Sequence, residues 1–507
     1  MSVFVVCILF ACHENQFNPD RNLSRDDFSG LSVDSYRMSV SRINEQIAAI
    51  LKGDSGTLTV DRHARGHYLS GGPLLWVTRH GVTSQADTLL RYLKTVDAIG
   101  FSQSSFFADQ IEADLEKMKS LDFAGSDINE VAARLDYNLT KAYLRYAMGQ
   151  RYGFVNPYKA LNGLDLDPYD TLKKNYRVLY DVKTELPDGK VVAHLLGQIA
   201  RDSVANVLQT AETDDPLYRK LKALLPSVRG AERTRVLVNM ERCRWRHDHY
   251  PSDCDKYVLV NIPAYELLAV EKGNVQRMKV VCGKQQTKTP LLNSAIMRMD
   301  VNPKWAVPTN IVKHEMSRHA GDADYFARNN YVVTDKNTGV TVLPEELTEE
   351  DLRTGNYRVV QEGGEQNSLG RIIFRFNNNF SIYLHDTPTR SAFSRADRGA
   401  SHGCVRVEKP FDLACFLLKG KSESVLDNLK YSMQVSLAPS ADDEEHTTVA
   451  KVDKSRLIRS LEVKPHVPLF ITYFTKLLMP DGRLESFGDV YGYDRVIANK
   501  LKGYTKH

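Results

Sequence analysis

The chain has 507 residues, of which 42% are hydrophobic and 26% are charged, and its formal net charge is +4. This length allows two or three domains with cores of their own, and the composition is ordinary for a soluble globular protein. The small, dispersed charge, without a basic run interleaved with aromatic residues, argues against a nucleic-acid-binding protein. After residue 12, no apolar stretch approaches the roughly 20 residues that a membrane-spanning helix needs.

The first twelve residues, MSVFVVCILFAC, are almost entirely apolar, and polar sequence follows directly. They are too short to span a bilayer but suit the apolar part of a secretion signal. The segment LFAC resembles a bacterial lipoprotein box, so we expect export to the periplasm and a lipid anchor on Cys12 as the chain's one membrane contact. The alternative, a buried N-terminal strand, is less favoured because the sequence turns polar at once. Residues 13–38 are polar and aperiodic, which predicts a tether.

The chain has seven cysteines and no C-x-x-C pair, which argues against zinc ribbons and thioredoxin-type redox motifs. Cys243 and Cys254 could form a disulfide in an oxidising compartment, but only their geometry can decide this.

Apolar residues recur at helical spacing over residues 39–230, which predicts a helical scaffold domain. The strongest examples are Ile43, Ile47, Ile50 and Leu51, and the long amphipathic stretch that begins at Ile128. Two further helices are expected near 191–209 and 215–225. This half offers no convergent set of nucleophile, base and orienting group.

The pattern changes after one lead-in helix near residue 231, and strands and turns dominate to residue 507. Hairpins are expected to turn at 271–274, 377–379 and 480–482. A polar stretch of about 55 residues, over 311–368, is too long for a structureless loop, so it is an insertion with its own structure or a functional lid. The expected fold class is therefore α+β, with a helical N-terminal domain and a β-rich domain over 231–507.

The octapeptide ASHGCVRV contains Cys404, which is either a small buried hydrophobic residue or a nucleophile. Gly403 would let the backbone turn so that successive N–H groups point one way. The N–H groups of His402, Gly403 and Cys404 are then the natural donors to an oxyanion.

Two histidines could serve Cys404 as a base. His385 ends the predicted strand FSIYLHD, where it can meet a cysteine on a neighbouring strand, so we favour it over His402, which more simply shapes the loop. A nearby imidazolium would greatly raise the thiolate fraction of the cysteine. Arg406 shares a face with Cys404 if this segment is extended, and could hold a substrate carboxylate.

Each of these residues also has an ordinary structural interpretation when it is taken alone: a core cysteine, a surface histidine and an ion-paired arginine. A metal site built from His385, His402 and Cys404 is a further alternative, disfavoured because no carboxylates cluster with them.

Taken together, His385 and the later run Ser401-His402-Gly403-Cys404-Val405-Arg406 resemble the signature of the YkuD-type L,D-transpeptidase catalytic domain. Other segments, among them NPKWAVP and DGRLESFGDVYGYD, are similar to the long, murein-active branch of that family, and the resemblance covers roughly 231–507. The N-terminal half resembles, more weakly, the helical scaffold of that branch. The sequence leaves no room before the lead-in helix for the peptidoglycan-binding domain that the branch usually carries.

The resemblance implies a role for each motif residue. Cys404 would be the acylated nucleophile, His385 the general base and Asp386 the residue that orients the imidazole, often through its backbone carbonyl. The remaining positions fall into two groups: Ser401, His402 and Gly403 surround the oxyanion site, and Arg406, Tyr383 and Trp305 contact the substrate. Residues 311–368 would form a capping subdomain over it.

The resemblance also implies the reaction. Cys404 would attack the carbonyl of the third residue of a peptidoglycan tetrapeptide stem, D-Ala would leave, and the side-chain amine of a second stem would take the acyl group in a 3–3 cross-link. No cofactor and no metal are required. Water as acceptor would give an L,D-carboxypeptidase, a free D-amino acid would give exchange, and a lipoprotein amine is a further variant. A non-catalytic murein-binding lipoprotein is the alternative outside enzyme chemistry, although binding alone needs no thiol.

Overall fold

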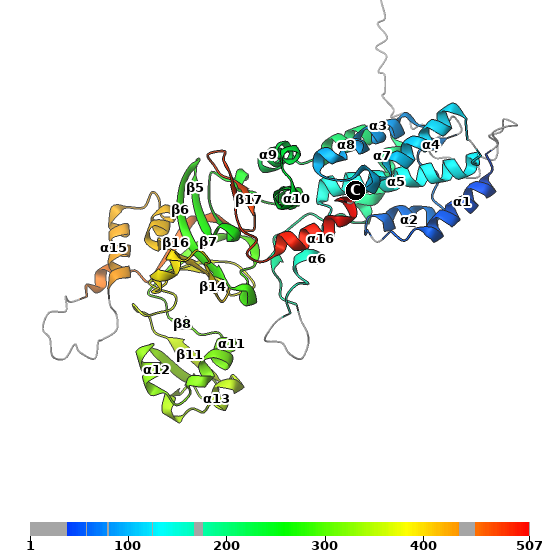
Figure 1. The fold of residues 1–507 in the computed structure, drawn as a ribbon. Helices are drawn as coiled ribbons and strands as arrows, with labels where there is room; N and C mark the ends of the chain where they lie inside the picture. The colour runs from blue at the N-terminus through cyan, green and yellow to red at the C-terminus, as the bar shows by residue number, and fades with distance from the viewer. Residues whose placement is uncertain are drawn as a thin grey trace, which may run out of the picture. The chain divides into compact units, whose positions relative to one another are not determined.

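The computed structural model describes residues 38–56, 58–78, 81–123, 125–166, 176–435 and 452–505. These residues form two compact units (Figure 1). The helical unit holds the described residues up to Asn156, then Thr184–Arg246 and the segment from Asp494. The β-rich unit holds Pro157–Lys183 and His247–Tyr493. The α+β class expected from the sequence is confirmed.

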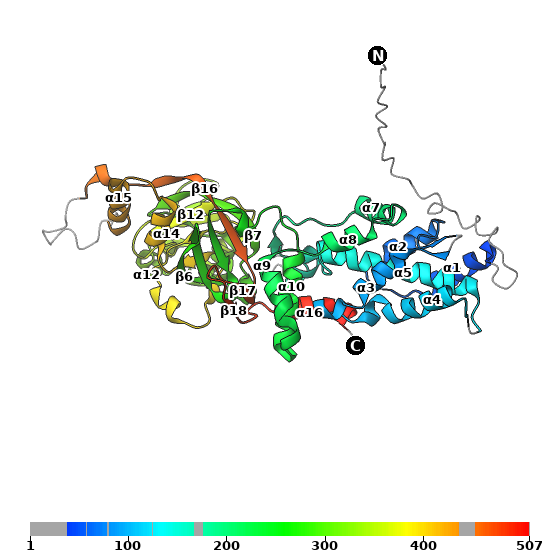
Figure 2. The ribbon, with the colours of Figure 1, turned by 90° about the horizontal axis from the view of Figure 1, so that it is seen from above.

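The helical unit is built around one long helix, α5 (Ile128–Tyr152), which lies among the other helices of this unit (Figure 2). Most of its residues are buried. The Asp127 side chain caps its first turn by accepting a hydrogen bond from the N–H of Asn129, and Gly153, with a φ of 88°, ends it. The other helices of this unit are α1 (Val40–Gly53), α2 (Asp61–Leu69), α3 (Ser84–Leu93), α4 (Ala108–Ser120), α7 (Gly189–Ala200), α8 (Val204–Ala211), α9 (Pro216–Leu224), α10 (Gly230–Arg244) and most of α16 (Tyr493–Thr505).

The single helix expected near 191–209 is wrong, because α7 and α8 are separate helices. Asp202 between them has a φ of 54°, which a continuing helix does not allow. The buried side chain of Gln85 satisfies both helix ends: its amide donates to the carbonyl of Ile199 at 2.9 Å and accepts from the N–H of Val204 at 3.0 Å. The break is therefore stabilised by a residue far away in the sequence.

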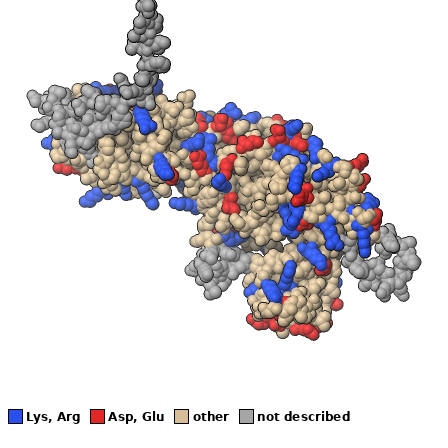
Figure 3. All heavy atoms as spheres, turned by 180° about the vertical axis from the view of Figure 1, so that it is seen from behind, with Lys and Arg blue, Asp and Glu red and all other residues tan. Residues whose placement is uncertain are grey.

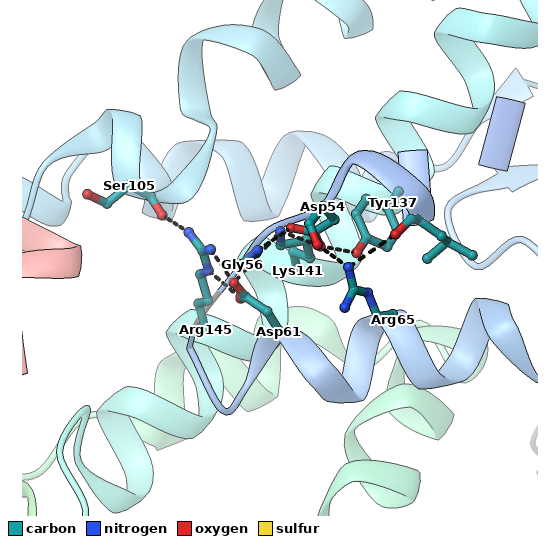
Figure 4. A network of polar contacts seen from close by, with 9 residues as sticks. Asp54, Gly56, Asp61, Arg65, Ser105, Tyr137, Lys141 and Arg145 are labelled. Atoms are coloured by element: carbon teal, nitrogen blue, oxygen red, sulfur yellow. Dashed lines mark hydrogen bonds and ion pairs between the residues drawn. The ribbon is translucent and has the colours of Figure 1, made fainter. Parts of the chain in front are cut away.

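A buried network of charges joins the α1–α2 connection to α5 (Figure 4). Arg145 binds both carboxylate oxygens of Asp61 at 2.7 and 2.6 Å, and Lys141 lies 3.0 Å from the carboxylate of Asp54. Tyr137 also donates to Asp54. Although burial alone would raise it, these partners lower the pKa of Asp54 to about 2. Because each buried charge has an opposite partner, the network belongs to the scaffold's stability and not to a reactive site.

The β-rich unit contains a sheet that closes on itself. Its strands follow the order β12-β13-β15-β6-β5-β4-β16-β7-β3, and β12 also pairs with β7. The strands are β3 (Tyr180–Asp181), β4 (Lys256–Asn261), β5 (Glu266–Glu271), β6 (Asn274–Gly283), β7 (Leu291–Val301), β12 (Ile372–Phe376), β13 (Leu384–His385), β15 (Val405–Val407) and β16 (Ser460–Thr472), with β14 (Gly399–Ser401) beside β6. All three expected hairpins are formed, as β5–β6, β12–β13 and β17 (Lys476–Leu478)–β18 (Leu484–Ser486). The connection of the second one is longer than the expected turn at 377–379 and covers residues 377–383.

The β-rich unit has boundaries different from the predicted 231–507. It takes in Pro157–Lys183, whose strand β3 pairs with β7, while α10 and the segment from Asp494 belong to the helical unit. Between α9 and α10 lie only residues 225–229, so no domain is inserted there.

The stretch expected as an insertion over 311–368 has a fold of its own, which we call the cap. A four-stranded sheet, β10 (Thr341–Val342)-β9 (Tyr331–Asp335)-β11 (Tyr357–Gln361)-β8 (Trp305–Ala306), packs with α11 (Thr309–Ile311), α12 (Ala323–Arg328) and α13 (Glu349–Thr354). Its buried core includes Val312, Phe326 and Leu352. Two further helices of the β-rich unit, α14 (Pro410–Leu417) and α15 (Glu423–Gln434), follow the motif strand β15.

The predicted signal over 1–12, with Cys12, and the tether over 13–38 lie outside the described residues, except for the last residue of the tether. Among the residues that are described, no helix has the length and apolarity to cross a membrane. Cys243 and Cys254 are both free thiols, so the disulfide considered from the sequence is not formed. On the face shown in Figure 3, basic and acidic side chains are interspersed, in keeping with the small net charge.

Candidate active site

Two parallel strands, β13 and β15, carry the motif residues. Leu384 pairs with Val405 and His385 with Arg406. The N–H of Val405 donates to the carbonyl of Tyr383 at 3.0 Å. The same register therefore continues by one residue and places Tyr383 opposite Cys404. Paired residues of neighbouring strands point to the same side, and alternate residues along a strand share a face. The strand pairing therefore collects four side chains on one face of the sheet: Tyr383, His385, Cys404 and Arg406.

Cys404 directly precedes strand β15 and is partly buried. Burial raises the pKa of its thiol, although the N–H of Tyr383, which points at the sulfur, and the charge of Arg406 act in the opposite direction. Cys404 is therefore a neutral thiol at neutral pH. The N–H of Tyr383 and the charge of Arg406 are placed to stabilise the thiolate when it forms.

His385 is only 4% exposed, and its Nδ1 lies against the backbone carbonyl of Asp386. A carbonyl can only accept, so Nδ1 carries the proton and Nε2 is left as the basic nitrogen. Burial, and then the charge of Arg406, lower the pKa of His385 to about 4. In the resting state both groups are therefore neutral, because the site is desolvated.

Asp386 acts on His385 through its main chain, while its carboxylate is used elsewhere. One carboxylate oxygen accepts the N–H of Arg371 at 2.8 Å, and the other lies 3.2 Å from the guanidinium of Arg390. Gly370 leaves room for this carboxylate, because a Cβ at that position would lie 2.5 Å from it. The aspartate is therefore held so that its carbonyl faces the imidazole.

Arg406 lies on the same face and carries no hydrogen bond or ion pair to any residue that the structure describes. Its Nε is buried without a partner, and burial lowers the pKa of the guanidinium. A desolvated arginine without a counter-ion is costly in the free protein, and a bound carboxylate would remove that cost. Arg406 is thus suited to hold an anionic group of a substrate beside Cys404.

The loop before Cys404 is closed by Ser401. Its hydroxyl donates to the carbonyl of Cys404 at 2.5 Å and accepts the N–H of Gly403 at 3.1 Å. Gly403 has a φ of 116°, a conformation that other residues rarely adopt. The expectation that the Gly403 N–H is an oxyanion donor is therefore wrong, since Ser401 occupies it. The N–H groups of His402 and Cys404 have no acceptor among the described residues.

The three remaining predicted site residues, His402, Trp305 and Tyr383, lie in different places. His402 lies in the loop with its Nε2 2.7 Å from Oε1 of Glu315, a residue of the π-helical turn Val312–Met316 of the cap. Trp305 belongs to strand β8 and packs on the core of the cap. Tyr383 lies beneath the guanidinium of Arg375, 5.1 Å from its ring centre. Of the three, only Tyr383 is on the face that carries Cys404.

Sequence reasoning missed Thr287 and Thr289, which bind the carbonyls of the Ser401–Cys404 loop. They are two positions apart in TKTP, and this spacing carries no signal that would link them to residues more than a hundred positions later. Among the described residues, no group of three or more His, Cys, Asp or Glu is arranged to hold a metal ion.

The neutral state of both groups predicts the pH dependence of Cys404 reactivity. His385, with its pKa of about 4, does not titrate between pH 6 and 9, whereas the thiolate fraction of Cys404 rises over the whole range. We expect alkylation of Cys404 by iodoacetamide to quicken by up to about tenfold per pH unit from 6 to 9. Mass spectrometry of the adduct against time measures this rate. A rate that is flat from pH 6 upward would instead show a preformed thiolate–imidazolium pair.

The chain matches two family models. Residues 255–426 match the L,D-transpeptidase catalytic domain (YkuD), and residues 68–225 match a scaffold domain. The Haemophilus influenzae protein named "Putative L,D-transpeptidase" is 28% identical over 325 residues, which are 62% of this chain and 60% of that relative. The chain thus spans less than two thirds of the length of this relative. The chain thus contains a region that matches a scaffold domain, followed by a region that matches the L,D-transpeptidase catalytic domain (YkuD).

Proposed function

We propose that this protein is an L,D-transpeptidase that forms 3–3 cross-links between peptidoglycan stem peptides through a Cys404 thioester. The observation that carries the proposal is the shared face of the motif strands, where a thiol, a histidine with a basic Nε2 and an unpaired arginine come together. The donor substrate would be a tetrapeptide stem, whose carboxylates suit Arg406.

The first step is acyl transfer to the thiol. The Cys404 sulfur attacks the carbonyl carbon of the third stem residue while His385 Nε2 takes the thiol proton. The negative charge that develops on the carbonyl oxygen is stabilised by the N–H groups of His402 and Cys404. The amide C–N bond then breaks, and D-Ala leaves with the proton that His385 returns to its nitrogen. The product is a thioester on Cys404.

The second step reverses these roles. The side-chain amine of a second stem attacks the thioester carbonyl, His385 takes a proton from that amine, and the C–S bond breaks. The proton passes to the sulfur, which regenerates the thiol. Water as acceptor would give a carboxypeptidase and a D-amino acid would give exchange, since the acylation step is common to all three. None of these steps needs a cofactor.

Product analysis separates these reactions. Purified protein is incubated with disaccharide tetrapeptides, and products are identified by mass. A dimer with loss of one D-Ala supports transpeptidation, a tripeptide alone indicates hydrolysis, and incorporation of added D-Met indicates exchange. If D-Ala is not released and no thioester forms, the proposal is wrong and a murein-binding role is favoured.

We also propose that the protein is a periplasmic lipoprotein anchored through Cys12, so that the enzyme acts on peptidoglycan next to the membrane. A single acyl chain anchors weakly, so stable anchoring relies on the several chains of a bacterial lipoprotein. Cells fed with a clickable fatty acid should label the wild-type chain, and Cys12→Ser should abolish the label. Persistence of the label in Cys12→Ser would place the lipid elsewhere, and Cys7→Ser provides the matched control.

A further inference from the structure

The proposed oxyanion donors, the N–H groups of His402 and Cys404, lie in the loop 401–404, whose carbonyls are held by residues 284–289. We infer that Thr287 and Thr289 are positioning residues that aim the N–H groups of His402 and Cys404 at the reacting carbonyl. This inference rests on the proposed function, because it concerns the acylation of Cys404. It follows from the geometry of two peptide planes.

The first plane joins Ser401 to His402. The carbonyl of Ser401 accepts two hydrogen bonds, from the hydroxyl of Thr287 at 2.8 Å and from the N–H of Lys284 at 3.0 Å. In a trans peptide, the C=O and the N–H of the next residue point in opposite directions, and this peptide is trans. Holding the Ser401 carbonyl against residues 284–287 therefore turns the N–H of His402 away from them.

The second plane joins Gly403 to Cys404 and repeats the arrangement. The hydroxyl of Thr289 donates to the carbonyl of Gly403 at 2.9 Å, so the N–H of Cys404 also points away from the threonine segment. Between the two planes, the N–H of Gly403 is held by Ser401. The N–H groups of His402 and Cys404 therefore point to the same side and have no acceptor among the described residues. The N–H of Gly403, between them, is bound to Ser401 and does not point to that side.

The threonine segment is itself held rigidly. Thr289 is fully buried, and its hydroxyl accepts the N–H of Gly283 at 2.9 Å while it donates to Gly403. The hydroxyl of Tyr491 accepts the N–H of Thr289 at 3.1 Å and donates to the carbonyl of Gly283 at 2.7 Å. No side chain fits at Gly283, where a Cβ would lie 2.1 Å from the carbonyl oxygen of Thr287. The donors to the loop are therefore fixed before any substrate binds.

Two residues from earlier in the chain, Asp165 and Arg177, contact the turn that carries Thr287 and Thr289. Arg177 donates to the carbonyls of Gln286 and Lys288 at 2.8 and 3.2 Å, and Lys288 forms an ion pair with Asp165. The match to the scaffold model includes this segment, yet it packs in the β-rich unit. Two residues within the match to the scaffold model, Asp165 and Arg177, therefore bind the turn whose threonines hold the loop 401–404.

The test compares two reactions of the same thiol. Acylation by a carbapenem passes through an oxyanion, whereas alkylation by iodoacetamide does not, so only acylation depends on the N–H donors. Removal of a whole oxyanion donor costs about 100- to 1000-fold, and loss of its orientation should cost less. For Thr289→Val, which keeps the shape and removes the hydroxyl, we expect acylation about tenfold to 100-fold slower and alkylation unchanged within about twofold. Thr289→Ser should restore acylation.

Thr287→Val is the milder second variant, because Lys284 still holds the carbonyl of Ser401, and we expect a loss of about threefold in acylation alone. Unchanged acylation in both valine variants overturns the inference. A parallel loss of alkylation also overturns it, because the threonines would then hold the thiol or the fold. If the wild-type chain is not acylated while its thiol is alkylated, the proposed function fails first, and the inference fails with it.

Discussion

Cys404→Ala should abolish acylation, with the adduct formed by a carbapenem and the cross-linked product both below about a thousandth of the wild-type level. The reason is that the sulfur is the atom to which the acyl group bonds, so nothing else in the site can replace it. The thiol accepts a hydrogen bond from the N–H of Tyr383, and the substitution removes a single heavy atom. We therefore expect a folded protein, with a free energy of unfolding changed by about 1 to 2 kcal/mol.

Cys254→Ala is the matched control, because Cys254 is a free and partly buried thiol of the same unit. It should keep full activity and full labelling. Intact mass followed by peptide mapping locates the adduct in each variant. An adduct that persists in Cys404→Ala, on Cys254 or Cys415, would mean that Cys404 is an ordinary core cysteine.

Sequence reasoning could place His385 and Cys404 near each other because they lie only 19 positions apart in the sequence. His385 ends one strand and Cys404 directly precedes another, so a prediction of two neighbouring strands is enough to bring them onto one face. The hairpins followed in the same way from turn residues such as those at 271–274. The electrostatic state could not be predicted, because the pKa of His385 depends on how completely the surrounding chain removes water from it.

The hydrogen bonds of the loop 401–404 also could not be predicted from the sequence. Which N–H groups stay free depends on the Ser401 hydroxyl, whose rotamer is set by the fold, and on Thr287 and Thr289, which are remote in sequence. The same limit explains the single helix predicted over 191–209. Its apolar spacing is continuous, but Gln85, more than a hundred residues earlier, satisfies the ends at which it breaks.

His385→Asn should slow acylation by about 100- to 10,000-fold, whereas His402→Asn should slow it by less than about tenfold. Asparagine can keep the donor that His385 Nδ1 offers to the carbonyl of Asp386 but has no basic nitrogen in place of Nε2. His402 is partly exposed and contacts Glu315 of the cap, so its side chain is expected to affect cap contact more than proton transfer. Single-turnover acylation at pH 7 measures both variants.

The pH dependence distinguishes a lost base from a disturbed fold. A variant without the base still reacts through thiolate formed by ionisation in solution, so the deficit of His385→Asn should shrink as the pH rises from 7 toward the raised pKa of the Cys404 thiol. A structural defect would leave the ratio of wild-type to variant rates constant over this range. Equal losses in the two asparagine variants would mean that His402 shares the proton transfer, and a larger loss in His402→Asn would transfer the role of base to it. The imidazole of His385 is neutral above about pH 5 and stays available as a base. We therefore expect the acylation rate of the wild-type protein not to decrease between pH 7 and the pKa of the Cys404 thiol.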